Sequence, residues 1–369
     1  MTSVLRLREL VDVVIGVDTH VQTHSAAAID ASNGAVLDQI TVPATGEGYE
    51  ELLDFADQIS QDHAAMRAWA IEGTGSHGRG LSTRLRTGQE LVIEVDRPHR
   101  PHRRGGVKSD HLDAVRAARE ALTRPHLNTP RGAGLDEATA QLRQALTTRL
   151  AMRRSAVQAA SDARRQLFSA VLTAPEPVRA RLRGLSGTAL ITTAAALRTH
   201  AGWATTDLET TTTVTCLRTL ARRIQSLTTE AAEHEHHLRD LVHTWRPDLL
   251  AQPGLGPTTA AIVLCAWSHP GRVHSEAAFA KLAGVSPIEA TSGQIHIRHR
   301  LNRYGDRRLN SALHTIALVR QRHHQPTRAY TARRTTDGKT PREIRRCLKR
   351  YIIRDLYRLL ESPPTLDAT

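Results

Sequence analysis

Aromatic side chains are scarce in this 369-residue chain, where Phe, Trp and Tyr together make up 3%. A hydrophobic core must therefore be built from Leu, Val, Ile and Ala. Cysteine is equally rare. The three cysteines, Cys216, Cys265 and Cys347, are odd in number and far apart, so they predict neither a disulfide framework nor a CxxC metal pair. This usage favours a reducing compartment.

Long apolar runs are also missing. The longest, residues 260–267, is far shorter than the ~20 residues that a membrane-spanning helix needs. Residues 1–11 carry Arg6, Arg8 and Glu9 without an extended apolar stretch, so we do not expect a signal peptide. These absences predict a cytoplasmic protein with no membrane partner.

The overall composition is that of a folded chain. Hydrophobic residues make up 40% and charged residues 24%, which excludes wholesale disorder and a collagen-like class. The length predicts two or three domains. Basic residues outnumber acidic ones by 50 to 37, for a net charge of +13, and this excess indicates a polyanionic partner.

The positive charge is concentrated near the C-terminus. Residues 294–358 hold 18 basic and 4 acidic side chains, a net +14, so the rest of the chain is close to neutral. Such a segment is typical of proteins that neutralise nucleic-acid phosphates. A second basic cluster without acids contains Arg97, Arg100, Arg103, Arg104 and Lys108.

The first 125 residues alternate between strand and helix patterns. Three strands come first, the Asn-Gly pair at 33–34 predicts a hairpin turn between the second and third, and crossover units follow. The order β-β-β-α-β-α-β-α predicts an RNase H-like mixed sheet. We expect strands at 11–17, 25–30, 36–42, 68–71 and 90–95, and helices at 48–60, 78–86 and 109–122.

The remaining chain reads as mainly helical, so the fold class is α/β plus α. Helical patterns at 135–172 and 217–245 predict an antiparallel pair or coiled coil, and the Thr-rich stretch 205–215 between them is expected to be a loop. Further helices are expected at 259–267, 277–283, 307–321 and 342–360. We predict domains at 1–125, 126–247 (a helical connector), 248–330 and 331–369 (a basic C-terminal helix).

Four acidic side chains stand where this topology would gather them. Asp18 and Glu72 follow the first and fourth strands, which are neighbours in an RNase H-like sheet, and Asp110 and Asp113 share one face of a helix start. Clustered carboxylates repel unless a cation compensates them, so the set favours one or two Mg²⁺ ions acting on a phosphodiester. His20 and His24 are expected to line this site without being ligands, and His234, His236 and His237 to be solvated.

Two further patterns lie in the C-terminal half. The turn Pro253–Pro257 opens a helix, so Gly254 and Gly256 could present backbone N–H groups to a phosphate, as in a helix-hairpin-helix element. The loop at 284–293 places Ser286 and Ser292 before several arginines, and a serine there could attack phosphorus. Candidate nucleic-acid contacts are Arg103, Arg104, Lys108, Arg298, Arg300, Arg303, Arg307 and Arg308.

Taken together these segments resemble the IS110-type transposases, or DEDD recombinases. Residues 16–24 (GVDTHVQTH) resemble the family's G-[IV]-D-x-x-K-x-x-H, with Val21 in place of the Lys. The other matching segments are 72–75 (EGTG, for E-x-T-G), 108–114 (KSDHLDA, for K-x-D-x-x-D-A), 253–259 (PGLGPTT, for P-G-[IV]-G-P-x-T), 283–293 (for A-G-x-x-P…S-G) and 302–309 (NRYGDRRL, for N-R-x-G-[ND]-x-x-L).

The resemblance implies a RuvC-like N-terminal domain, a coiled-coil connector and a C-terminal transposase domain. It implies that Asp18, Glu72, Asp110 and Asp113 bind Mg²⁺ and that Ser292, aligned with the family's Ser-Gly pair, is the nucleophile, ahead of Ser286. It also implies donor and target DNA, a non-coding guide RNA, dimers or tetramers with active sites shared between protomers, and a place at the bacterial nucleoid.

Three other interpretations remain open from the residues. A metal-dependent nuclease resembling a Holliday-junction resolvase would need the acids but would use water in place of Ser292. A non-catalytic nucleic-acid-binding protein would need neither. A sugar-kinase-like role for residues 16–19 leaves the basic C-terminal segment without a purpose.

Overall fold

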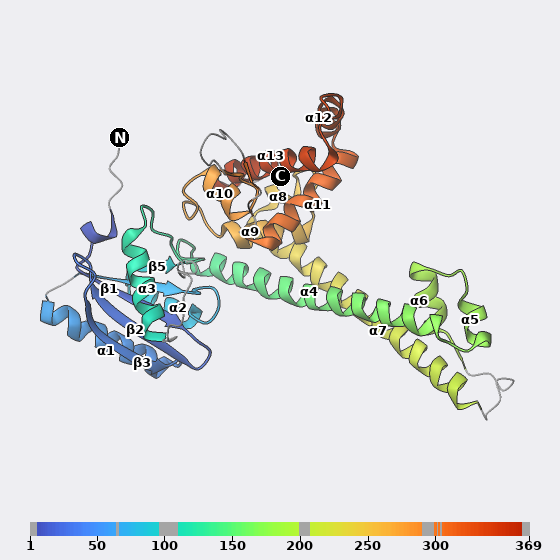
Figure 1. Ribbon diagram of the computed structural model, residues 1–369, viewed down its shortest axis with the longest axis horizontal. Coiled ribbons are helices and arrows are strands. Elements are labelled where there is room, and N and C mark those ends of the chain that lie inside the picture. The colour runs from blue at the N-terminus through green and yellow to red at the C-terminus, as the bar shows by residue number, and fades with distance from the viewer. Residues whose placement is uncertain are drawn as a thin grey trace. The chain divides into compact units, whose positions relative to one another are not determined.

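The computed structural model describes residues 6–63, 66–95, 110–198, 207–289, 299–300, 302 and 305–363. The chain forms two compact units (Figure 1). Unit 1 holds the residues up to Leu135 together with Ser268–His274, and unit 2 holds Asp136–Trp267 and the residues from Ser275 onward. The finer division into four domains stays a prediction.

Unit 1 is built on a five-stranded mixed sheet with the order β3-β2-β1-β4-β5. The antiparallel meander comprises β1 (Val13–Thr19), β2 (Thr23–Asp30) and β3 (Val36–Pro43). The strands β4 (Arg67–Glu72) and β5 (Val92–Val95) continue the sheet in parallel with β1. The predicted RNase H-like mixed sheet is thereby confirmed.

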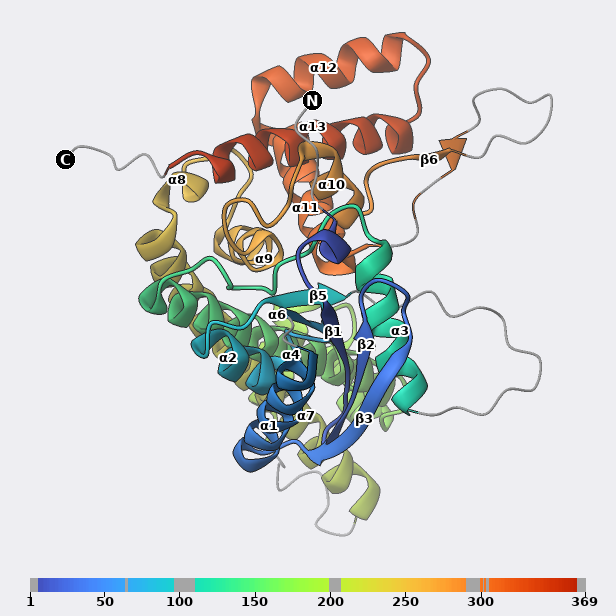
Figure 2. The same ribbon diagram turned by 90° about the vertical axis from the view of Figure 1, so that its left-hand side faces the viewer.

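Helices cover both faces of this sheet (Figure 2). One face packs on α3 (Asp110–Thr123) through a core that also takes in Leu7 of the short 3-10 helix Leu7–Glu9. The other face packs on α1 (Gly46–His63) and α2 (Arg79–Thr87). Among the largest fully buried side chains that the structure describes in unit 1, Trp69 is the one aromatic residue, so the core is mainly aliphatic, as the composition indicates.

A single glycine allows α3 to lie against the middle of β1. A Cβ atom at Gly16 would lie 2.0 Å from the carbonyl oxygen of Ala114 and 2.9 Å from Cβ of Ala118. Both neighbours belong to α3, and a carbonyl oxygen cannot swing aside as a flexible side chain can. Glycine is therefore required here for close backbone approach, two residues before Asp18.

A segment from late in the sequence completes unit 1. The Arg272 guanidinium lies 3.2 Å from the Glu94 carboxylate of β5, and both side chains are about nine-tenths buried. Ser268 Oγ accepts a hydrogen bond of 2.8 Å from the backbone N–H of Gly132. Sequence patterns do not reveal this pairing, because its partners are more than a hundred residues apart.

Unit 2 contains the predicted antiparallel helix pair, formed by α4 (Glu137–Leu172) and α7 (Leu208–Trp245). Ion pairs and hydrogen bonds run across it, from Arg153 to Glu235 and from Arg164 to Thr228. The buried residues of α7 recur at alternating spacings of four and three, which is the pattern of a coiled-coil seam. They include Thr210, Val214, Leu217, Ala221 and Ile224.

The Thr-rich stretch 205–215 was expected to be a loop, and this expectation is wrong for its described part. The helix α7 begins at Leu208, and Asp207 caps it by accepting a hydrogen bond from the backbone N–H of Thr210. The seam continues through buried Thr210 and Val214. Burial in the seam and an N-cap together outweigh the weak helix propensity of threonine.

Two short helices that the sequence reading missed, α5 (Glu176–Leu182) and α6 (Gly187–Ala195), pack onto the same end of the pair. Unit 2 also holds α8 (Pro247–Leu250), α9 (Pro257–Trp267), α10 (Glu276–Leu282) and the short strands β6 (Ile288–Glu289) and β7 (His299–Arg300). Its last helices are α11 (Arg307–His323), α12 (Gln325–Thr336) and α13 (Pro341–Glu361).

Buried Arg246 ties α13 to the helical connector. Its guanidinium makes two hydrogen bonds to Asp248 and donates to the backbone oxygens of Leu359 and Leu360. The Leu359 oxygen also accepts from the backbone N–H of Ser362, so the guanidinium adds a second donor there and supplies one to Leu360 in the last turn of α13. None of the helices in the described ranges is long and apolar enough to span a membrane.

We predict that Gly16→Ala lowers the free energy of unfolding by about 1–3 kcal/mol, because the new methyl group overpacks the contact between β1 and α3. Gly46→Ala is the matched control. A Cβ at Gly46 meets nothing within 4 Å, so this change should be neutral or slightly stabilising. Urea denaturation of the full chain measures both, and equal midpoints for the two variants would contradict the packing argument.

Candidate metal centre

The acidic site lies at the end of β1, on the face of the sheet that α3 covers. Asp18 is the sixth residue of β1, which runs two residues further than predicted. Its side chain is 12% exposed. Val17, just before it, belongs to the core on the α1 side. Side chains alternate between faces along a strand, so Asp18 projects toward α3.

Two further polar groups meet Asp18. His20 Nε2 lies 3.2 Å from Asp18 Oδ2 and 3.6 Å from Asp110 Oδ1. Asp110 is the first residue of α3, and the short turn between β1 and β2 directs His20 back over the strand end. One ligand atom from each of the three residues lies within 4.8 Å of the other two. In the part of the chain that the structure describes, this is the group whose geometry suits a metal ion.

Glu72, another predicted ligand, stands beside Asp18 across the sheet. Val17 pairs with Ile71 in the parallel register of β1 and β4, so Asp18 and Glu72 are next in line and share a face. The Thr19 hydroxyl donates to the backbone oxygen of Glu72 at 2.9 Å, which fixes the two strand ends together. The Glu72 side chain is not one of the three closely grouped donors.

Asp113, the fourth predicted ligand, is buried one turn into α3. Its Oδ1 accepts a hydrogen bond of 2.6 Å from Arg116 Nη1, an i,i+3 pair on the same helix. It therefore has a cation beside it already. Asp113 is close enough to Asp18 to act on it electrostatically. The structure thus brings Asp18 and Asp110 together with His20, places Asp113 near enough to act on Asp18, and puts Glu72 next to Asp18 across the sheet.

Burial is the main influence on the Asp18 carboxyl. It raises the pKa of Asp18 above the usual value, the Asp113 and Asp110 carboxylates raise it further, and His20 opposes them. An ionised Asp18 is therefore electrostatically strained when nothing but His20 compensates it. A divalent cation would remove this strain, and two carboxylates with a neutral imidazole form a donor set that fits such an ion.

His20 and His24 lie on different sides of the sheet, and only His20 belongs to the group of three donors. The sequence reading put His20 and His24 along the acidic site and counted neither as a ligand, yet His20 is one of the three grouped donors. His24 is fully buried and stacks on Tyr49 of α1, with ring centroids 5.7 Å apart. Burial lowers the pKa of His24. The expected place of His24 is thus wrong, because its contact with α1 puts it on the opposite face from Asp18.

Backbone groups of the Gly-rich turn before α9 form hydrogen bonds with the start of α9 and with α11. Gly256 N–H donates to the Thr259 hydroxyl at 3.0 Å, and the Arg320 guanidinium donates to the Pro253 oxygen at 2.7 Å. Gly254 adopts a φ of 82°, and a Cβ there would lie 3.0 Å from the Ile316 oxygen. The turn packs against α11, and this contact accounts for Gly254. A phosphate-binding role for Gly254 and Gly256 stays a prediction.

Several predicted residues lie outside the described ranges. The strands β6 and β7 pair through Ile288 with Arg300 and Glu289 with His299, and the segment between them carries Ser292. Ser286 precedes β6 and is half-buried, and Arg307 and Arg308 are exposed in the first turn of α11. The residues outside the description are Ser292, Arg103, Arg104, Lys108, Arg298 and Arg303.

We predict opposite effects of Asp18→Asn with and without a divalent cation. In EDTA the variant should unfold at the same or a higher temperature than the wild type, because it removes a buried charge that faces two other carboxylates. With Mg²⁺ or Mn²⁺ at about 100 times its dissociation constant, the wild type should gain about 2.7 kcal/mol and the variant much less.

Thermal unfolding of the full chain with a cation titration measures this effect. Asp38→Asn is the control, since Asp38 is an exposed carboxylate on β3. A gain from the cation that is equal in Asp18→Asn and in wild type would show that Asp18 does not bind the ion.

Comparison with known protein families adds an independent result. Residues 15–173 match the model of a DEDD transposase of the IS110 type, and residues 247–332 match the model described as the transposase IS116/IS110/IS902 family. Among curated proteins no sequence matches the chain. The two matched segments cover most of the chain in the family's order, one around the acidic site and the other over the Gly-rich turn and α11. This chain therefore belongs to the IS110 family of transposases.

Proposed function

We propose that this protein cuts and rejoins DNA strands to move an insertion element, using a divalent cation and a serine nucleophile. The observation that carries the proposal is the meeting of Asp18, His20 and Asp110 at the end of β1, inside the segment that matches the DEDD transposase model. A polyanionic partner accords with the net +13 of the chain.

Asp18, Asp110 and His20 would hold Mg²⁺, with Glu72 and Asp113 beside them. A bound Mg²⁺ supplies positive charge that stabilises the negative charge growing on a phosphodiester under attack. The chain's own contribution is placement. Gly16 lets α3 approach β1, the first turn of α3 delivers Asp110, and the β1–β2 turn delivers His20. Arg116 forms an ion pair with Asp113 nearby.

Ser292 is the proposed nucleophile. Its Oγ would form a bond to phosphorus as one P–O bond to deoxyribose breaks, and the leaving oxygen would take up a proton. The resulting phosphoserine ester conserves the energy of the broken bond, so a strand hydroxyl can later displace the serine and reseal DNA. Arginines around residues 298–308 would stabilise the charge on the phosphoryl oxygens.

Assembly and guidance belong to the same proposal. The family resemblance favours a non-coding RNA that chooses donor and target DNA, and dimers or tetramers whose active sites combine parts of different protomers. We expect the protein to work at the bacterial nucleoid, in the cytoplasm. Sizing of the protein with and without co-expressed RNA from the flanks of its gene tests these points.

A trapping experiment tests the nucleophile. Wild type with Mg²⁺ and element-end DNA should give a protein–DNA adduct that survives denaturation, and Ser292→Ala should lower strand exchange by about 10³-fold or more and abolish the adduct. Ser286→Ala is the matched control, because it removes a neighbouring serine hydroxyl, and it should keep the adduct.

Other results of the trapping experiment would point to a different nucleophile or a different function. Strand cleavage by Ser292→Ala without an adduct would indicate a nuclease that uses water, and an adduct lost only in Ser286→Ala would move the nucleophile. Asp18→Asn should lose both adduct and cleavage. DNA binding without cleavage in the wild type, at every cation tested, would favour a non-catalytic binding protein.

A further inference from the structure

A pocket in unit 2 is lined in part by four residues of the motif at 302–309, which are Asn302, Gly305, Asp306 and Arg307. The pocket has a volume of about 410 Å³ and lies between the turn after α10, the start of α11 and one residue of α13. Its polar and charged lining residues are Asn302, Asp306, Arg307, Asn310, Ser311, His314 and Lys349.

Lys349 is the most constrained cation in this pocket. Its Nζ donates a hydrogen bond of 2.9 Å to Asn310 Oδ1, and Asn310 Nδ2 donates at 2.7 Å to the backbone oxygen of Ala283. The second bond fixes the amide so that its oxygen faces the ammonium. An ammonium group has three donors, so Lys349 keeps two that this amide does not use.

Basic side chains outnumber acidic ones around Lys349. Arg307 lines the same pocket, and Arg346 is close enough to add to the effect of burial, which lowers the pKa of Lys349. His314 lines it too, but burial and the charges of Lys349 and Arg345 lower the pKa of His314, so it offers a hydrogen-bonding imidazole and not a further positive charge. The one acidic lining residue, Asp306, caps α11 by accepting from the N–H groups of Arg308 and Leu309. No carboxylate of the described ranges forms an ion pair with Lys349. Lys349, Arg307 and Arg346 outnumber the one lining carboxylate, and the excess of positive charge favours an anion as ligand.

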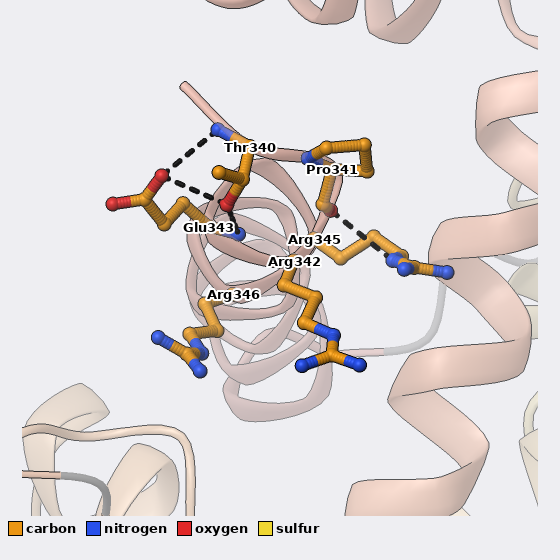
Figure 3. A pocket seen from close by; sticks show the side chains of 6 residues that line it. All are labelled: Thr340, Pro341, Arg342, Glu343, Arg345 and Arg346. Carbon is orange, nitrogen blue, oxygen red and sulfur yellow. Dashed lines mark hydrogen bonds between the residues drawn. The ribbon is translucent and has the colours of Figure 1, made fainter. Parts of the chain in front are cut away.

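A basic stripe continues from the pocket along α13. Arg342, Arg345 and Arg346 precede Lys349 by seven, four and three residues, so all four share one side of the helix. Figure 3 shows Arg342 and Arg346 projecting away from the cap formed by Thr340 and Glu343. The Glu343 carboxylate is engaged in that cap, where it accepts from the Thr340 backbone and hydroxyl.

The pocket suits a phosphate better than a base or a nucleoside. Its described lining has no Phe, Tyr or Trp ring on which a base could stack, and its donors are an ammonium, a guanidinium, amides, a hydroxyl and an imidazole. The row of cations beside the pocket can neutralise a row of negative charges, and the phosphates of a nucleic-acid strand form such a row. The pocket also falls mainly within the residues that match the transposase model.

We propose that Lys349 and Asn310, with Arg307 and His314, form a binding site, here called the phosphate seat, for one phosphate of the DNA backbone. Arg342, Arg345 and Arg346 would contact the phosphates that follow along the strand. That the bound strand is DNA rests on the proposed function. That the pocket binds a phosphate group does not. Its role is to hold DNA, so it should operate without a divalent cation and without Ser292.

The first test uses inorganic phosphate and thermal unfolding of the full chain. Phosphate, compared with chloride at matched ionic strength, should raise the unfolding temperature of wild type and of Lys339→Met, and raise that of Lys349→Met clearly less. Lys339 is an exposed lysine outside the pocket and controls for the general stabilising effect of phosphate. Without phosphate, Lys349→Met should unfold no earlier than wild type, because it removes a half-buried cation from a group of cations.

The second test measures DNA binding in EDTA, where the proposed function predicts no strand cleavage. Lys349→Met should weaken binding to a labelled duplex about equally for any sequence, and reduce the slope of log affinity against log salt by about 1. Arg307→Met, an exposed change that the fold should tolerate, should act in the same direction. Lys349→Arg keeps the charge and should retain more binding than Lys349→Met.

The outcomes separate this inference from the proposed function. Wild-type affinity for phosphate and DNA in both Lys349→Met and Arg307→Met would overturn the seat, whatever the cleavage assays show. Loss of binding to an RNA of the same sequence, with DNA binding intact, would overturn the assignment to DNA. If Ser292→Ala and Asp18→Asn keep full strand exchange while Lys349→Met loses phosphate binding, the chemistry is wrong and the seat stands.

Discussion

The contact between β1 and α3 at Gly16 is the constraint on which the acidic site depends. Only a residue without a side chain lets the carbonyl of Ala114 come so near the strand. That approach brings the first turn of α3 to the end of β1, where Asp110 meets Asp18 and His20. A bulkier residue would push the helix outward and take one carboxylate away from the other.

The same closeness has an electrostatic cost. Asp18 is nearly buried and faces Asp113 and Asp110, which raises its pKa, and His20 compensates only in part. Such strained arrangements persist where function requires them. A site whose carboxylates repel one another binds a cation more tightly, because the ion relieves this repulsion as well as forming new bonds. The Lys349 pocket shows the opposite case, in which a bound anion would reduce the repulsion between neighbouring cations.

Much of the fold could be predicted because its signals are local. The alternation of apolar residues in the first 125 positions and the helical spacing of the long connector both follow from side-chain burial along one element. The prediction failed at the Thr-rich start of α7, where propensity pointed one way and the buried seam through Thr210 and Val214 decided the other. It placed His20 beside the acids without counting it as a ligand, because a histidine two residues after an aspartate has no distinctive spacing, and the structure groups it with Asp18 and Asp110.

The sequence by itself determined the family, the order of strands in the first unit and the candidate acids, because motifs and periodicity are written along the chain. Tertiary structure alone decided which acids meet, how Arg272 from a distant segment reaches Glu94, and that Lys349 lies over Asn310. These contacts join residues 39 to 178 positions apart. No local pattern encodes such a distance, since it depends on how whole helices and sheets pack against one another.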